Sequence, residues 1–258
     1  MTSKTLVTVF DNRAALIQGL ADRFVETVHG ILEGQAETHV VLTGGSVGID
    51  SLAAIAACNA TADIDWARIH LWWGDERWLP AGDSERNDAQ AEAVFLSKIA
   101  CPPANIHRFP SADGGLSLDA AARAYASELT AHGTEGARYP AFDLVFLGVG
   151  PDGHIASLFP GHEGIKEREE TVIPVRNSPK PPPERLSLTL PVINSAALVW
   201  LCLSGADKAP ALGLALAGAN VAEVPVAGVK GTNKTVFFVD RSATAEVPED
   251  LLEASLNA

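Results

Sequence analysis

Asp152 and His154 are the two side chains whose types and spacing best suit acid–base chemistry. They lie in a glycine-rich turn, residues 148–153, directly after an apolar segment at 142–147. An unbroken apolar run is typical of a strand covered on both faces of a parallel sheet, and sites form just past such strands. The turn lets the backbone approach a ligand closely, and histidine titrates nearest neutrality. The alternative is a structural turn with a hydrogen-bonded histidine.

A second glycine turn, Gly44-Gly45-Ser46, follows an apolar segment at 39–42 and precedes a segment of helical period. Exposed backbone N–H groups and a helix N-terminus both favour anions, so this turn could hold a phosphate. It has neither the spacing nor the lysine of a Walker loop, and it does not match G-x-G-x-x-G. Ser46 could equally serve as the helix cap.

Asp75, Glu76 and Arg77 come directly after the apolar segment 69–73. They form either a solvated turn or the rim of a site. Arg77 could bind an oxyanion through two N–H groups, whereas Asp75 could orient a polar substrate or serve as a base. The neighbouring tryptophans are interpreted as packing residues.

Two further cations precede or follow predicted strands. Arg185 opens an apolar strand segment, and Lys208 lies in the first turn of a helix that follows Gly205. A lysine at this end of a helix opposes the helix dipole, which makes most sense if an anion lies between them. The alternative for both residues is a solvated surface charge.

Segments of strand length alternate with segments of helical period along the chain. Strands are predicted at residues 5–10, 39–42, 69–73, 142–147, 186–190, 197–203 and 236–239, and helices at 13–32, 48–58, 89–99, 118–132, 206–216 and 248–256. This alternation predicts an α/β domain with a mainly parallel sheet and helices on both faces. The proline-rich stretch 179–183 is too short for a domain linker, so residues 1–258 are expected to form a single domain.

The chain has 258 residues, 19 basic and 32 acidic, with a formal net charge of −13. Such a charge repels nucleic acid and anionic membrane surfaces, so an anionic ligand requires locally focused basic residues. No charged start followed by an apolar run, and no membrane-spanning stretch, is visible, which predicts a soluble cytoplasmic protein. We expect a monomer.

The cysteines and histidines show no metal-binding spacing. The three cysteines, Cys58, Cys101 and Cys202, are unclustered, odd in number and set in apolar sequence, which predicts reduced packing residues. The remaining histidines are scattered along the chain, so no metal site is expected; they are His29, His39, His70, His107 and His132. His162 is left outside the candidate site because a histidine in a polar loop is usually solvated.

Five motifs occur in the order typical of 6-phosphogluconolactonases, and the resemblance covers most of the chain. They are Gly44-Gly45-Ser46; Gly74-Asp75-Glu76-Arg77 with Ser84 and Asn87; the block from Gly148 to Gly161; the segment from Ser178 to Arg185; and the segment from Gly205 to Ala209. The resemblance implies a modified doubly wound α/β sheet of the sugar-phosphate isomerase and lactonase type, with no metal and no nucleotide cofactor. The chain departs from the family's Pro-Ala-x-x-Val pattern at 225–229, which reads Pro-Val-Ala-Gly-Val.

The resemblance implies hydrolysis of 6-phospho-D-glucono-1,5-lactone to 6-phosphogluconate, the second step of the oxidative pentose phosphate pathway. His154 would then take a proton from water and return it to the departing ring oxygen, and Asp152 could orient the imidazole. Backbone N–H groups of the Gly44-Gly45 turn or of Gly150, or the Arg77 guanidinium, are candidate donors to the oxyanion.

The same resemblance implies a phosphate clamp made of Arg185 and Lys208 with Gly45 and Ser46. Such a clamp would let an acidic protein bind an anionic substrate.

Three other functions stay open. A deaminase or isomerase of the same fold would use Asp75 to move a proton, but such enzymes resemble Asp-Glu-Tyr at that loop and Phe-Asn-Glu-Pro after the histidine block. Here these positions read Asp75-Glu76-Arg77 and Ser157-Leu158-Phe159-Pro160. A nucleotide-dependent oxidoreductase would need glycines after the first strand, where residues 11–13 offer none. A non-catalytic sugar-phosphate binding protein would keep the basic clamp without needing His154.

Overall fold

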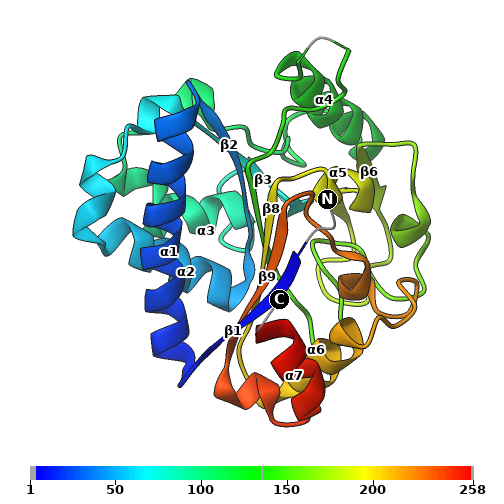
Figure 1. Ribbon diagram of the computed structural model, residues 1–258. Helices are drawn as coiled ribbons and strands as arrows, with labels where there is room; N and C mark the ends of the chain where they lie inside the picture. Colours follow the sequence, from blue (N-terminus) through cyan, green and yellow to red (C-terminus); the bar gives the residue numbers. More distant parts are fainter. Residues whose placement is uncertain (1–3, 135, 257–258) are drawn as a thin grey trace.

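A six-stranded parallel sheet forms the centre of the molecule (Figure 1). The computed structural model describes residues 4–134 and 136–256. In spatial order the strands are β1 (Lys4–Phe10), β9 (Lys234–Asp240), β8 (Leu198–Leu203), β5 (Leu144–Gly148), β2 (Thr38–Leu42) and β3 (Ile69–Trp73). All five residues of β2 are buried, as expected for a central strand covered on both faces.

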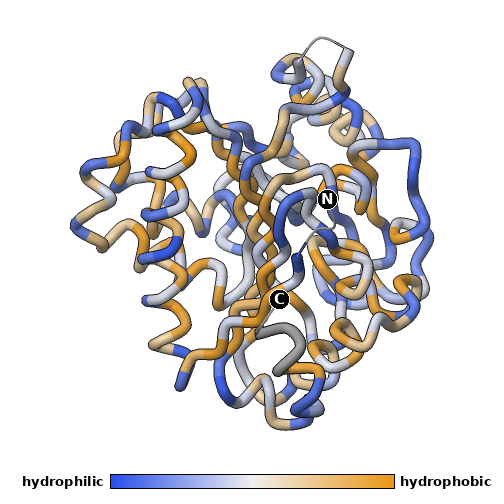
Figure 2. The backbone as a smooth tube through the Cα atoms, in the orientation of Figure 1, coloured by the Kyte–Doolittle hydropathy of each residue, from blue (hydrophilic) through white to orange (hydrophobic). Residues whose placement is uncertain are grey.

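Helices cover both faces of this sheet (Figure 1). On one side lie α1 (Arg13–Gly34), α2 (Gly45–Ala57) and α3 (Asn87–Val94), and on the other α4 (Leu118–Ala131), α5 (Leu190–Asn194), α6 (Ala209–Leu216) and α7 (Glu249–Leu256). Hydrophobic residues concentrate along the central strands (Figure 2), and buried residues of the surrounding helices belong to the same core. The prediction of an α/β fold with a mainly parallel sheet and helices on both faces is confirmed.

A second, three-stranded antiparallel sheet lies beside the first. Its order is β4 (Asp75–Arg77), β7 (Arg185–Leu188) and β6 (Val172–Val175). The strand predicted at 186–190 is β7, but it ends at Leu188 because α5 begins at Leu190 with a proline in its first turn. Neither β4 nor β6 was predicted.

Three helix boundaries differ from the prediction. The helix expected at 48–58 begins at Gly45, so Gly44 is the N-cap and Ser46 is not. The helix expected at 89–99 is α3 followed by a 3₁₀ turn at Leu96–Lys98, and the one expected at 206–216 is a 3₁₀ turn at Ala206–Lys208 followed by α6.

The prediction that the remaining histidines are scattered is wrong for four of them. His39 and His70 are register partners at the amino ends of β2 and β3, and their rings stack 4.7 Å apart. His107 and His132 lie against the same group. By contrast, the three cysteines are free, as expected: Cys202 is buried and the other two are half-buried. Within 4–134 and 136–256, no helix has the length and apolarity needed to cross a membrane.

Candidate active site

A pocket of about 280 Å³ lies beyond the carboxyl ends of β2, β3, β5 and β8. In doubly wound folds this edge of the sheet is where ligands bind. The loops after these strands supply the wall: residues 43–48 after β2, residues 148–151 with His154 and Ala156 after β5, and Ser204 with Lys208 after β8. Asp75 and Arg77 join them from β4, and Lys180 and Arg185 from the segment around β7.

Asp152 and His154 meet in the turn after β5. Nδ1 of His154 lies 2.5 Å from Oδ1 of Asp152. A carboxylate only accepts hydrogen bonds, so Nδ1 holds the proton and Nε2 keeps the lone pair. Burial alone would raise the pKa of Asp152, but the hydrogen bond and charge of His154, helped by Lys180, hold this pKa well below its usual range. The carboxylate is therefore ionised at neutral pH.

The turn is built so that this pair can form. A Cβ at Gly150 would lie 1.9 Å from Nδ1 of His154 and 2.5 Å from Oδ1 of Asp152, so the pair can keep this geometry only if residue 150 is glycine. Gly153 has a φ of +79°, which L-residues with side chains rarely adopt. The N–H of Gly150 already donates to the carbonyl of His154 at 2.9 Å, which removes it from the candidate oxyanion donors.

Lys180 adds a cation beside the Asp152–His154 pair. Its Nζ lies 3.2 Å from Nδ1 of His154 and 3.5 Å from Oδ1 of Asp152. The side chain comes from the proline-rich segment 179–183, and Lys180 lines the pocket. The segment was part of a motif that resembles the family, but Lys180 was not among the predicted site residues.

Arg77 and Arg185 face each other as register partners across β4 and β7. Like charges directly opposite in a sheet repel, and they are stable together only near negative charge. Asp75 provides part of it, with Oδ2 4.0 Å from Nη1 of Arg185. Burial lowers the pKa of Arg185, and Arg77 acts in the same direction while Asp75 opposes it. A guanidinium stays protonated nonetheless, so the two arginines present positive charge to the pocket.

Two buried polar atoms at this wall have no hydrogen-bonding partner among the described residues: Nε of Arg77 and Oδ1 of Asn87. Both residues line the pocket. Buried polar groups are rarely left unpaired, so these atoms point to a ligand with both donor and acceptor groups. Asn87, like Lys180, belonged to a quoted motif but was not predicted as a site residue.

Asp75 is almost completely enclosed, with 8% of its surface exposed. The hydroxyl of Ser157 donates to Oδ2 at 2.6 Å, and Nδ2 of Asn87 donates to the Asp75 carbonyl at 2.8 Å and to Oδ1 at 3.3 Å. With both carboxylate oxygens engaged and Arg185 beside it, Asp75 holds neighbouring side chains in place.

The start of α2 forms the opposite wall. Gly44 caps this 13-residue helix without a side-chain hydrogen bond, and Gly45 has a φ of +77°. The first N–H groups of the helix therefore lack a side-chain cap at the pocket, where the helix dipole favours an anion. Lys208 reaches the same pocket, with Nζ 3.5 Å from its neighbour Asp207.

Eight of the nine predicted site residues line this one pocket. They are Gly44, Gly45, Ser46, Asp75, Arg77, His154, Arg185 and Lys208. The ninth, Asp152, does not line the pocket, and it contacts Nδ1 of His154. His162 lines a different hollow and packs against Phe159, 5.8 Å between ring centroids.

The parallel sheet and the basic pocket at its carboxyl edge define an α/β protein of the sugar-phosphate isomerase and lactonase type. The family model described as "Glucosamine-6-phosphate isomerases/6-phosphogluconolactonase" matches residues 11–238. The chain belongs to this family.

Individual relatives agree with this assignment. The chain is 44% identical to the 6-phosphogluconolactonase of Streptomyces coelicolor over 97% of this chain and 98% of the relative. It is 39% identical to that of Mycobacterium tuberculosis over 94% and 98%. Among solved structures, the 6-phosphogluconolactonase of Thermotoga maritima superposes with a TM-score of 0.80 at 27% identity, over 92% of this chain and 100% of that one.

Proposed function

We propose that the protein hydrolyses 6-phospho-D-glucono-1,5-lactone to 6-phosphogluconate in the oxidative pentose phosphate pathway. The observation that supports this most is the 2.5 Å contact between Asp152 and His154 in a pocket that also contains Arg77, Arg185 and Lys208. An oriented base and a cluster of cations are what a phosphorylated lactone requires. The family's 6-phosphogluconolactonases, such as that of Streptomyces coelicolor, support the same assignment.

His154 is the general base in this proposal. Its Nε2 takes a proton from water as the water oxygen forms a bond to the lactone carbonyl carbon. The resulting oxyanion is stabilised by N–H groups at Gly44 and Gly45 or by the Arg77 guanidinium. The intermediate then collapses, the bond between the carbonyl carbon and the ring oxygen breaks, and His154 returns the proton to that oxygen. Asp152 keeps the ring oriented and stabilises the imidazolium.

Arg185 and Lys208, with Gly45 and Ser46, bind the phosphate. Arg185 is held by three backbone carbonyls: Nε donates to Pro182, and Nη2 donates to Lys180 and Pro181, at 2.9 to 3.2 Å. A guanidinium positioned in this way loses little conformational entropy when it binds an anion. We infer that Asp75 is a positioning residue for Arg185 and not the base, since its oxygens already accept hydrogen bonds from Ser157 and Asn87.

The test is turnover of freshly made 6-phospho-D-glucono-1,5-lactone, followed as 6-phosphogluconate formed and corrected for spontaneous hydrolysis. We expect a rate that rises in proportion to protein concentration. A parallel assay with glucosamine 6-phosphate should release no ammonia. A rate equal to spontaneous hydrolysis at every protein concentration would reduce the protein to a sugar-phosphate binder, and ammonia release would assign it to the deaminases.

A further inference from the structure

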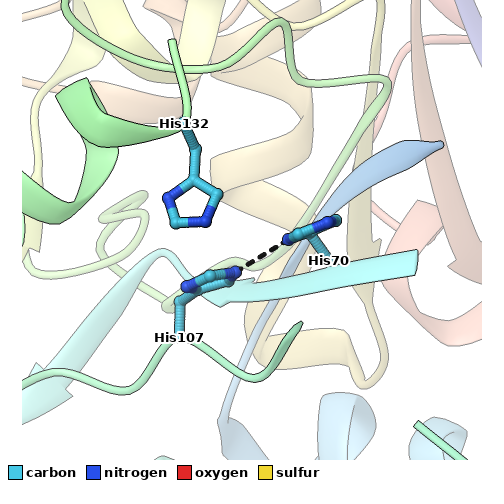
Figure 3. A group of neighbouring side chains, drawn as sticks. All are labelled: His70, His107 and His132. Atoms are coloured by element: carbon cyan, nitrogen blue, oxygen red, sulfur yellow. Dashed lines mark hydrogen bonds between the residues drawn. The ribbon is translucent and has the colours of Figure 1, made fainter. Parts of the chain in front are cut away.

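Four histidines gather at the end of the sheet opposite the pocket, at the amino ends of β2 and β3. One ring nitrogen from each of His70, His107 and His132 lies within 4.8 Å of the other two. Figure 3 shows the ring of His132 pointing toward the other two rings. These residues come from β3, from the segment after the 3₁₀ turn Pro103–Asn105, and from the C-cap of α4. Three distant chain segments therefore place imidazoles around one point.

The hydrogen bonds of His107 and His132 fix their tautomers. Oε1 of Glu128 lies 2.9 Å from Nδ1 of His107, and the carbonyl oxygen of Glu128 lies 3.1 Å from Nδ1 of His132. Both oxygens only accept, so each Nδ1 bears the hydrogen. In the neutral rings, the lone pair is then on Nε2.

The two ring nitrogens of His70 lie near a carboxylate and near the ring of His107. Its Nε2 lies 3.7 Å from Oε2 of Glu37, while its Nδ1 lies 2.9 Å from Nε2 of His107. Because Nε2 of His107 is an acceptor, Nδ1 of His70 donates its hydrogen to it when no ion is bound. Metal binding uses the other tautomer of His70, in which the hydrogen is on Nε2 beside Glu37 and Nδ1 offers its lone pair to the ion.

His39 is the fourth histidine of the group, and its ring stacks on that of His70. Nε1 of Trp72 donates to Nδ1 of His39 at 3.1 Å, so this lone pair is already used. Imidazole binds a metal ion in its neutral form. Burial lowers the pKa of His107 to about 4 and also lowers that of His70.

We propose that His70, His107 and His132 bind a divalent transition-metal ion, with Zn²⁺ the first candidate. An all-imidazole donor set suits zinc, copper, nickel and cobalt and does not suit magnesium or calcium. In each of the three rings, the nitrogen that does not bind the metal lies near an oxygen of Glu37 or Glu128, as in most histidine metal sites. The fourth position belongs to water.

The geometry needs a small adjustment to hold the ion. Tetrahedral zinc with Zn–N bonds of about 2.05 Å separates its nitrogens by roughly 3.4 Å. His70 and His107 must therefore open slightly, and His132 must move inward. His132 is free to do so, because its side chain is 28% exposed at the helix end, whereas His107 is fixed by its stack on Trp72, 3.8 Å between centroids.

The site is separate from the candidate active site. His70 and Gly74 lie at opposite ends of β3, roughly 13 Å apart at the rise of a strand. The ion would join β3, the segment at 107 and the end of α4, which stabilises the fold without touching the substrate.

The test is titration of chelator-treated protein with Zn²⁺ alone, by calorimetry and by thermal unfolding. We expect one equivalent bound with Kd below about 10 µM, and a Tm higher by about 5 to 10 °C at a zinc concentration near 100 Kd. His132→Gln and His70→Gln should weaken binding at least tenfold. His154→Gln tests whether the active-site pair takes the zinc, and His29→Gln on α1 controls for surface histidines; both should bind as the wild type does.

A wild-type Kd for zinc above about 10 µM would overturn the proposal. So would loss of binding in His154→Gln with retention in His132→Gln. Circular dichroism checks that each variant is folded, and His132→Gln is the decisive one because the residue is partly exposed. Calorimetry and Tm report binding independently of lactone turnover, so failure here is distinguishable from failure of the proposed function.

Discussion

Nδ1 of His154 lies 2.5 Å from Oδ1 of Asp152 across a turn in which residue 150 has no side chain. The two residues are separated by one position only, and the positive φ of Gly153 folds them back onto each other. The contact fixes which nitrogen of His154 is free to take a proton. It also places a carboxylate, ionised at neutral pH, where an imidazolium would form.

Replacement of His154 tests whether the protein is an enzyme or only binds sugar phosphates. We expect His154→Ala to lower kcat by about 10²- to 10⁴-fold, the usual contribution of a positioned acid–base group, while Kd for 6-phosphogluconate changes little. Steady-state turnover and calorimetric binding of the product give the two quantities. Near wild-type turnover in this variant would remove His154 from the mechanism and return attention to Asp75.

Gly150→Ala tests the geometry of the pair without changing either partner. The added Cβ would lie 1.9 Å from Nδ1 of His154, so the ring must move away from Asp152. We expect a loss of at least tenfold in kcat with a preserved fold. Gly30→Ala is the matched control, since a Cβ there meets nothing within 4 Å, and it should leave kcat unchanged and stabilise α1 by about 0.5–1 kcal/mol. Equal turnover in both variants would contradict the proposed role of the pair.

Arg185→Ala and Lys208→Ala test the phosphate clamp. Phosphate is remote from the reacting carbon, so much of its binding is shared by the ground and transition states, and KM should rise more than kcat falls. The comparison substrate is unphosphorylated gluconolactone, whose turnover should change far less. A residue whose loss impairs both substrates equally does not bind phosphate.

The lowered pKa of Lys208 predicts that ligand binding depends on pH. Burial lowers the pKa of its ammonium, and the charge of Lys180 acts in the same direction against Asp207. A lowered pKa means that the charge is lost at a lower pH than in a free lysine, so affinity for 6-phosphogluconate should fall as pH rises toward the ordinary lysine pKa of about 10.4. Lys208→Met should bind more weakly at pH 8 and show a flatter profile, measured by calorimetry. An unchanged profile in Lys208→Met would assign the titration to another group.

Removal of metal ions should leave turnover intact. The proposed mechanism uses His154, backbone N–H groups and guanidinium groups, and the proposed zinc site lies at the other end of β3. Exhaustive chelation is therefore expected to lower the Tm of zinc-loaded protein without lowering kcat. Loss of activity on chelation, with recovery on addition of zinc or magnesium, would contradict this expectation.

The parallel sheet could be predicted because its strands are apolar runs separated by helical periodicity. The strand at 69–73 was predicted with its observed bounds. The strand predicted at 5–10 is one residue shorter than β1, which begins at Lys4. The small sheet could not be predicted in the same way. Residues 75–77 are all charged and 172–175 contain a proline, so only their pairing with β7 makes them strands.

The candidate site was accessible from sequence because its residues follow strand ends and form recognisable motifs. Lys180 was missed because its contact with His154 depends on the path of a loop 26 residues away. The histidine group was missed for a related reason. His39 and His70 are 31 residues apart, and only the register of β2 against β3 places them opposite each other.

The opposed arginines of β4 and β7 link ligand binding to the folding of the small sheet. Arg77 and Arg185 repel each other across the strand pair, and Asp75 offsets this only in part. A substrate phosphate bound at Arg185 would supply negative charge beside this pair, so part of the binding free energy becomes free energy of strand pairing. β4 and β7 are already paired in the structure, and substrate binding should protect their backbone amides further against hydrogen exchange.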